Sequence, residues 1–322
     1  AYMRHVIDND DNIEANYVPY PVQDSIPYLP TDIKNKCLEE IKTATKNSCT
    51  AANFDDFTLN TFGPTLQEIF IRPYNEKVWT VPLKEMNYVW VENRIPRTGI
   101  EDLTRRCQLS LHELEAEENN KVVSMFRYPS NSRGIGEVWQ AIASELPADW
   151  FRLRSKVIKL DPERRTVVLV GIGMRRPQPE FTEKLSWLYF PQPDIVFYRC
   201  TFMSNFNERL TPNAALFWSV LVEIGMKVDE PVNESKIIES TINDLIKHGI
   251  IYPTNSIESK WIHVLPHGYP IPTLKRDDEL RKAHNQLEKK RIFSRGRESN
   301  FILTFAECST MVDNIHVLVF LQ

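Results

Sequence analysis

Apolar residues recur at helical spacing through the first third of the chain, after an opening stretch that is rich in tyrosine and proline. That stretch, residues 1–30, contains YVPYPVQDSIPYLP, which is typical of an edge strand and turns. The spacing that follows predicts a helix that is capped by Thr31 or Asp32 and runs through Ile33, Cys37, Ile41 and Ala44. Further helices are predicted at Leu66–Phe70, with an end before Pro73, and at Ile100–Asn119. We therefore expect residues 31–120 to form a mostly helical layer.

Beyond residue 120, short aromatic and β-branched runs favour strands. These runs are Lys121–Tyr128, Val157–Leu160, Thr166–Val170, Trp187–Phe190, Ile195–Met203 and Ala215–Ile224. Val157–Leu160 and Thr166–Val170 flank the turn sequence DPERR and are expected to form a hairpin, while the last three runs are expected to pair in one sheet. Helices are predicted at Gly136–Leu146, at Glu234–His248 with Gly249 as C-cap, and at Asp277–Lys290.

The order of these elements predicts an α+β fold, in which an antiparallel sheet domain carries a helical domain inserted early in the chain. Residues 1–30 would supply an edge strand and turns of the sheet domain, and residues 31–120 the helical domain. Residues 121–322 would supply the rest of the sheet domain with its flanking helices. The apolar tail runs Phe301–Phe305 and His316–Phe320 belong to this last part.

Glycine is scarce in this chain, and this changes the range of functions that the sequence allows. The chain has 322 residues, of which 42% are hydrophobic and 25% charged, and a formal charge of −4, which is an ordinary globular profile. It holds only 10 glycines but 21 prolines. Loops that bind the phosphates of a dinucleotide by close backbone approach require clustered glycine. The composition therefore argues against a complete dinucleotide-binding enzyme.

The charge and hydropathy patterns narrow the range of partners. A mildly acidic chain argues against nucleic acid, and the basic run at residues 289–297 is interpreted as a solvated helix end or a local anion site. The apolar runs are shorter than the ~18 residues that a membrane helix requires, so no membrane partner is expected. The five cysteines are scattered without a CxxC pair, which favours a reducing, cytoplasmic compartment without a disulfide framework or metal site.

Motifs of known catalytic chemistry are almost missing from the sequence. GIGM at Gly171–Met174 follows a strand but leads into Arg-Arg-Pro instead of a helix, which disfavours a phosphate loop. What remains is a set of aromatic, amide and arginine side chains in unusual local contexts: Tyr20, Gln23, Tyr74, Asn75, Trp79, Arg94, Trp187, Tyr189, Arg199 and Tyr269.

This set of side chains suits a nucleotide-sugar. Aromatic faces stack on uracil or sugar, amides hydrogen-bond hydroxyls, and arginines bind a diphosphate through charge-assisted bonds. In the alternative interpretation the aromatic residues form the core and the arginines pair with nearby acids. Composition alone favours this alternative.

The order of the segments shifts the balance toward a ligand site. PYPVQ, RPYNEKVWTVP, WVENRI, FRYPSNSRGIGEVW, WLYFP, FYRCTFMSN, FWSVLVE, HGYPIPTL and SRGR follow one another along the chain. In this order, from Tyr2 to about Arg297, the chain resembles the eukaryotic UDP-galactopyranose mutases. The resemblance implies a flavoprotein isomerase that interconverts UDP-galactopyranose and UDP-galactofuranose through an adduct of reduced FAD with the sugar, with NAD(P)H as candidate reductant.

The resemblance also implies a role for each matching residue. Arg94 and Arg199 match the two arginines that bind the diphosphate, and Tyr189 and Tyr269 match tyrosines that hydrogen-bond it. Trp187 lies beside Tyr189 in the same strand. The positions around the uridine are Tyr20, Gln23, Asn75 and Trp79, and the remnants of the cofactor-binding region are Arg297 and Asn300.

The chain departs from the mutases mainly where they bind FAD. The glycine loop GxGxxG is missing, Val170 runs straight into Gly171 where the family has a long segment, and RFG-x-WRYEV does not follow Arg297. Apolar residues replace the polar flavin neighbours after Asn300, and a substrate-site asparagine falls on Val123. We expect a truncated chain in which the FAD-binding Rossmann part is largely missing, since each lost phosphate donor costs about 1–3 kcal/mol.

Three functions stay open at this point. The chain is a UDP-galactopyranose mutase, a non-catalytic UDP-sugar-binding module that has lost the flavin, or an inactive fragment of the enzyme.

Overall fold

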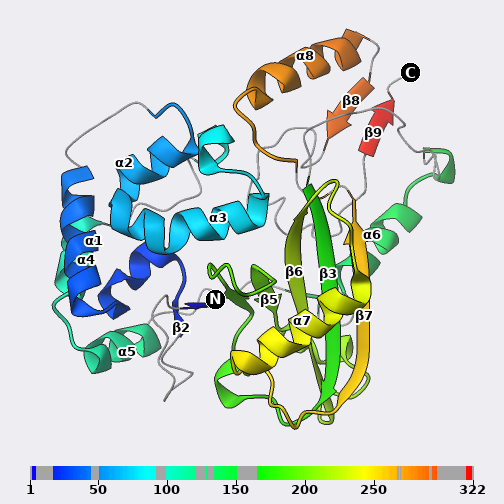
Figure 1. Ribbon diagram of the computed structural model, residues 1–322. Helices are drawn as coiled ribbons and strands as arrows, with labels where there is room; N and C mark the ends of the chain where they lie inside the picture. Colours follow the sequence, from blue (N-terminus) through cyan, green and yellow to red (C-terminus); the bar gives the residue numbers. More distant parts are fainter. Residues whose placement is uncertain are drawn as a thin grey trace.

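The computed structural model describes residues 2–4, 17–44, 51–91, 99–120, 128–129, 134–150, 165–266, 268, 270–289, 292–295 and 317–320. Figure 1 shows a group of helices beside a twisted sheet, with one further helix lying across a face of that sheet. This mixture of helices and a mainly antiparallel sheet confirms the α+β prediction at that level. The predicted domain boundaries at residues 30 and 120 stay a prediction.

Seven strands form the main sheet in the order β2-β1-β4-β5-β6-β3-β7. The bounds are β1 Tyr2–Arg4, β2 Tyr17–Pro19, β3 Arg165–Arg175, β4 Trp187–Tyr189, β5 Arg199–Thr201, β6 Phe217–Lys227 and β7 Ile257–Leu265. Neighbouring strands of this sheet pair antiparallel, except that β1 runs parallel to β4. The expected edge strand is confirmed as β2, where a proline such as Pro19 is tolerated because one side of the strand needs no ladder bonds.

The pairing of the three aromatic runs in one sheet is confirmed, since β4, β5 and β6 are neighbours. The hairpin expected for Thr166–Val170 is wrong. Strand β3 is flanked by β6 on one side and β7 on the other, so both of its hydrogen-bonding edges are occupied. Val157–Leu160 lie outside the described residues. Strand β7 was missed because most of its side chains are exposed and give no alternation of apolar and polar positions.

The helices of the described residues are α1 Thr31–Ala44, α2 Phe54–Leu66, α3 Arg72–Trp79, α4 Ile100–Arg106, α5 Leu111–Asn120, α6 Ile135–Ser144, α7 Glu234–Lys247 and α8 Arg276–Lys289. The helices expected at residues 31, 136, 234 and 277 are confirmed to within a few residues. Gly249 has a positive φ of 68° just after α7, as a C-capping glycine requires. None of the helices in the described part of the chain combines the length and apolar character that crossing a membrane requires.

Two helix predictions need correction. The helical piece expected to end before Pro73 begins at Phe54 and continues through a π-helical turn, Gln67–Ile71, into α3. Pro73 lies in the first turn of α3, directly after the π-helical turn. The single helix expected over Ile100–Asn119 is two helices, because Ser110 starts α5 with a capping box: the backbone N–H and the hydroxyl of Ser110 both donate to Oε2 of Glu113.

The core consists of two clusters of buried side chains. The first lies between one face of the sheet and α7, and includes Val170 of β3, Val222 of β6 and Leu245 of α7. The second fills the helical layer around residues such as Leu66 and Leu103. Alternate side chains of β6 enter the first cluster, so the residues between them project from the opposite face, toward α3. Glu223 is one of the β6 residues that project from this opposite face.

A smaller sheet lies next to α8. Strand β8, Ile292–Arg295, pairs antiparallel with β9, Val317–Phe320. The apolar tail run His316–Phe320 thus contains a strand. Figure 1 shows both strands beside α8 and away from the middle of the main sheet. The apolar run Phe301–Phe305 and residues 121–127 of the strand expected at Lys121–Tyr128 lie outside the described residues.

Candidate functional site

Three side chains line up across the neighbouring strands β4, β5 and β6. The register places Tyr189 of β4 opposite Arg199 of β5, and Arg199 opposite Glu223 of β6. Residues that face each other across paired strands project from the same face of the sheet. The strand pairing therefore gathers a phenol, a guanidinium and a carboxylate from three segments that are far apart in the sequence.

Arg199 and Glu223 form a largely buried ion pair. The Nη2 atom of Arg199 lies 2.5 Å from Oε1 of Glu223, and the Nε–H donates to the same oxygen at 2.7 Å. The other carboxylate oxygen accepts a hydrogen bond of 2.8 Å from the hydroxyl of Tyr198. The Arg199 side chain is 18% exposed and that of Glu223 10%. The carboxylate thus fixes the orientation of a guanidinium that still reaches the surface.

Tyrosine rings surround this ion pair. The ring centroids of Tyr20 and Tyr189 are 4.5 Å apart, and Tyr74 of α3 meets Tyr189 edge-on at 5.7 Å and Tyr198 at 6.4 Å. Tyr20 follows β2, Tyr74 lies on α3, and Tyr189 lies on β4 in the middle of the sheet. Three separate parts of the chain therefore contribute rings around the ion pair. We call these residues the Arg199 cluster: Tyr20, Tyr74, Tyr189, Tyr198, Arg199 and Glu223. Tyr20 is 41% exposed, so the cluster is accessible from its side.

The charge state of the cluster favours an anionic ligand. Burial alone would lower the pKa of Arg199, but the carboxylate of Glu223 holds it above its usual value, so the guanidinium stays charged. Burial, with the added effect of Glu223, raises the pKa of Tyr198 to about 12. Burial also raises the pKa of Tyr74, although Arg199 acts against it. These phenols therefore remain neutral hydrogen-bond donors beside a permanent cation.

Two more predicted residues lie near the Arg199 cluster. Trp187 is two residues before Tyr189 on β4 and projects from the same face, where it meets Phe206 edge-on at 5.4 Å. Asn75 follows Tyr74 on α3, and its side-chain amide donates to the carbonyl of Ile71 in the preceding turn at 2.8 Å. The Asn75 amide is thus engaged with its own helix.

Trp79 and Gln23 are buried in the structure, at 7% and 4% exposure. The Trp79 ring lies 5.2 Å from the guanidinium of Arg165, which lies 5.5 Å from the Tyr198 ring on its other side. Trp79 is therefore linked to the Arg199 cluster through Arg165. Gln23 lies in the 3-10 helix Val22–Tyr28, which follows Tyr20. Direct contact of these two side chains with a uridine stays a prediction.

Arg94, Tyr269, Arg297 and Asn300 lie outside the described residues, so their predicted roles stay predictions. The sequence patterns did not indicate Glu223 and Tyr198 as partners of Arg199, although both lie in the segments FWSVLVE and FYRC. Nor did they indicate Arg165, which ends the charged sequence DPERR and begins an apolar strand. The adjacency of Tyr198 to Arg199 was the signal that could have indicated one of these roles.

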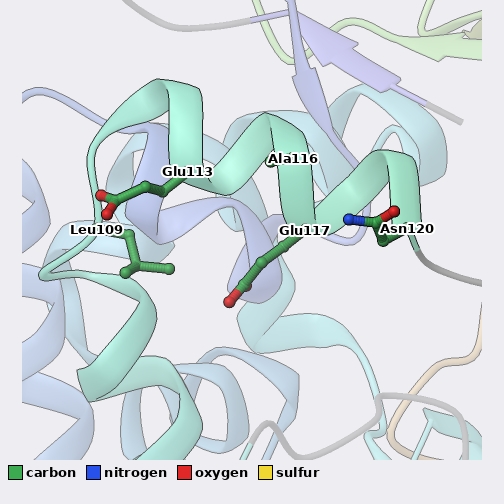
Figure 2. Close-up of a pocket in the computed structure, with 5 residues that line it drawn as sticks. All are labelled: Leu109, Glu113, Ala116, Glu117 and Asn120. Carbon is green, nitrogen blue, oxygen red and sulfur yellow. The ribbon is translucent and has the colours of Figure 1, made fainter.

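A hollow of about 550 Å³ lies elsewhere, along α5 (Figure 2). Its lining residues are Leu109, Glu113, Ala116, Glu117 and Asn120. The carboxylates already have partners within the helical layer, because Glu113 accepts from Ser110 and Glu117 pairs with Arg105 at 2.5 Å. Among the described residues, no group of three or more metal-ligating side chains comes together. The hollow therefore adds nothing to the Arg199 cluster.

Comparison with known proteins supports a mutase-like fold. No family model matches the chain. A solved structure of reduced UDP-galactopyranose mutase superposes with a TM-score of 0.74 and 28% sequence identity, over 88% of this chain and 70% of that chain. The fold is mutase-like. A protein provisionally described as a protoporphyrinogen oxidase from Exiguobacterium sp. 255-15 matches with 13% identity and a TM-score of 0.48, over 84% of this chain and 69% of that one, and so low a score carries no inference.

The described residues do not fit the pyrophosphate of FAD, which the resemblance implies as cofactor. Gly171 and Gly173 lie inside β3, not in a loop before a helix. A side chain at Gly171 would collide with the indole of Trp261 on β7, and one at Gly173 with the hydroxyl of Ser259. These glycines therefore make room for a neighbouring strand. Gly134 caps the start of α6 and Gly136 follows in its first turn, but the full GxGxxG loop, the usual binding site of a dinucleotide phosphate, is not found among the described residues.

Proposed function

We propose that the chain binds a UDP-sugar at the Arg199 cluster, as a UDP-galactopyranose mutase-like protein whose ligands are UDP-galactopyranose and UDP-galactofuranose. The observation that carries the proposal is the charged guanidinium of Arg199, held by Glu223 among four tyrosines. Charge-assisted bonds from arginine to phosphate oxygens are among the strongest hydrogen bonds in proteins. The cation would bind the diphosphate, and the neutral phenols other than Tyr198, whose hydroxyl donates to Glu223, would donate to its remaining oxygens.

The rings of the cluster supply the rest of the recognition. Tyr20, whose ring packs against Tyr189, and Trp187, two residues before Tyr189 on β4, would supply aromatic faces that stack on a base or on the apolar face of a sugar. Because the Arg199 side chain is only 18% exposed, its bonds to an anion would form in surroundings where water competes weakly. The likeness to reduced UDP-galactopyranose mutase supports this ligand class.

Ring interconversion of the sugar requires the chemistry of FAD, and the described residues offer no fit for its pyrophosphate. We therefore assign to these residues the binding and orientation of the UDP-sugar, and no chemical step. The same observation favours a second candidate, a non-catalytic UDP-sugar-binding module. The two candidates share the ligand and differ in flavin binding.

Titration calorimetry with UDP tests the shared part of the proposal, with uridine as the ligand that lacks the diphosphate. We expect UDP to bind and Arg199→Ala to weaken it by at least about 1.5 kcal/mol, the low end for a hydrogen bond to a charged group. A folded sample that binds no UDP would show the proposal to be wrong. The flavin absorbance of protein incubated with FAD, followed by an assay of UDP-galactofuranose conversion under reductant, then separates mutase from binding module.

A further inference from the structure

Lys77 makes contacts that the proposed ligand site does not use. It lies on α3, three residues after Tyr74, so both side chains share one face of the helix. Its Nζ atom donates to the backbone carbonyl of Gln192 at 2.8 Å and to that of Phe190 at 3.2 Å. Figure 1 shows that α3 extends from the helical layer toward the sheet. Lys77 therefore joins two parts of the chain that are far apart in sequence.

The carbonyls that Lys77 binds belong to the connection between β4 and β5. This connection, residues 190–198, begins just after Tyr189 and leads directly into Arg199. It is held from the other side by α7, because Val196 N–H donates to Oδ2 of Asp244 at 2.8 Å. Lys77 thus links α3, which carries Tyr74, directly to the connection that leads from Tyr189 to Arg199.

The backbone of α3 also lies unusually close to the sheet at this point. A Cβ atom added at Gly225 of β6 would lie 2.6 Å from the carbonyl oxygen of Lys77. The absence of a side chain at Gly225 therefore lets the end of α3 rest on β6. This contact fixes the height of the helix above the sheet, while the side chain of Lys77 fixes its position along the connection.

The buried surroundings of Lys77 disfavour the charged form of its ammonium group. Burial lowers the pKa of Lys77 to about 7, although Asp194 of the connection and Asp244 of α7 act in the opposite direction. Asp194 is in turn paired with Lys247 of α7 at 3.1 Å. Buried charges are expensive to maintain unless their hydrogen bonds are satisfied, so the two carbonyl bonds are needed to keep the charged form there.

We propose that Lys77 is a positioning residue for the Arg199 cluster: its two carbonyl bonds set the distance from Tyr74 to Tyr189 and Arg199, and hence the affinity for a UDP-sugar. The inference rests on the proposed function. A charge-assisted hydrogen bond is about twice as strong as a neutral one, so loss of the proton from Lys77 loosens the tie between α3 and the connection. Ligand affinity should therefore fall as the pH rises through the range in which Lys77 titrates.

The test compares UDP binding by the full chain at about pH 6 and about pH 8.5, on either side of the Lys77 titration. We expect Lys77→Met, which loses both carbonyl bonds, to bind UDP about tenfold more weakly at the lower pH. It should also lack the part of the pH dependence that comes from Lys77. Lys77→Arg, charged at both pH values, should bind like the wild type at the lower pH and keep that affinity at the higher one. Lys247 of α7 is exposed and pairs with Asp194 of the same connection. Lys247→Met therefore removes a cation from the exposed surface, and this matched control should behave like the wild type.

Near-ultraviolet circular dichroism of the tyrosines, without ligand, gives a second readout over the same two pH values. The spectrum should change with pH in the wild type and in Lys247→Met, and stay constant in both Lys77 variants. Equal UDP affinities within about twofold for wild type, Lys77→Met and Lys77→Arg at both pH values, with equal spectra, would overturn the inference. If Lys77→Met does not fold, Lys77→Arg decides by its pH profile alone. Wild-type protein that binds no UDP but shows the Lys77-dependent spectral change would refute the proposed function and leave the positioning role standing.

Discussion

Glu223 holds Arg199 through one carboxylate oxygen, which accepts from Nε and lies 2.5 Å from Nη2, and keeps the other oxygen for Tyr198. From β6, the carboxylate thus connects Arg199 of β5 with Tyr198, the residue just before that strand. Because an ion pair that is mostly buried needs both partners, the pair gives the guanidinium a fixed direction before any ligand arrives. Preorganisation of this kind lowers the cost of binding.

Glu223→Gln should destabilise the free protein and increase the stabilising effect of UDP. The neutral amide leaves Arg199 without its counter-charge, at a cost of about 3 kcal/mol, the low end for breaking a buried pair. A bound diphosphate would replace the missing anion, so the rise in Tm on adding UDP should exceed that of the wild type. Urea unfolding and thermal melts with and without UDP measure both effects.

The control for this substitution is Glu258→Gln. Glu258 pairs with Arg175 at 2.7 Å on the exposed surface, where such pairs contribute about 0–1 kcal/mol. An equal loss of stability in both variants, or a UDP-induced shift no larger than in the wild type, would contradict the role given to Glu223.

Tyr189→Phe should weaken UDP binding by about tenfold, the loss of one hydrogen bond from an otherwise unchanged site. The substitution keeps the ring of Tyr189, and with it the ring contacts with Tyr20 and Tyr74. Tyr252→Phe, at a tyrosine that is 41% exposed and distant in sequence from the cluster, should leave UDP affinity unchanged. Calorimetry on the two variants side by side makes the comparison, and equal affinities would remove Tyr189 from the site.

The pattern of residues predicts β4 and β6 well because they are rich in aromatic and β-branched residues. The run expected as a strand at Ile195–Met203 is a strand only over β5, Arg199–Thr201. The pattern fails at β7, where the apolar residues Ile257 and Trp261 are exposed among polar ones, and at Ser110, where a capping box interrupts an otherwise continuous helical spacing. For the site, local motifs indicated Arg199 and Tyr189. They could not indicate that Glu223 stands opposite Arg199, because strand register is decided by packing across the whole sheet and not by a local signal.

Ser110→Ala should reduce stability without affecting the ligand site. The substitution removes the hydroxyl that donates to Glu113 at 2.7 Å and that accepts the N–H of Glu113 at the start of α5, a loss of about 1 kcal/mol. The carboxylate of Glu113 would return toward its ordinary pKa, which the bonds from Ser110 now lower. Chemical denaturation should show the lower midpoint, while UDP affinity stays that of the wild type. A changed affinity would show that α5 and the Arg199 cluster are coupled.

Lys77 makes the stability of the protein depend on pH in a definite direction. Its pKa is about 7 in the folded chain, against 10.5 for an unperturbed lysine, so between these values the unfolded state holds one more proton than the folded state. The free energy of unfolding contributed by this group therefore rises with pH, by up to about 1.4 kcal/mol per pH unit, from about 7 to about 10. Lys77→Met cannot titrate and should lack this slope, whereas Lys247→Met, at an exposed lysine paired with Asp194, should retain it. Urea unfolding of the three proteins across that range measures the difference, and parallel curves for wild type and Lys77→Met would contradict a depressed pKa at Lys77.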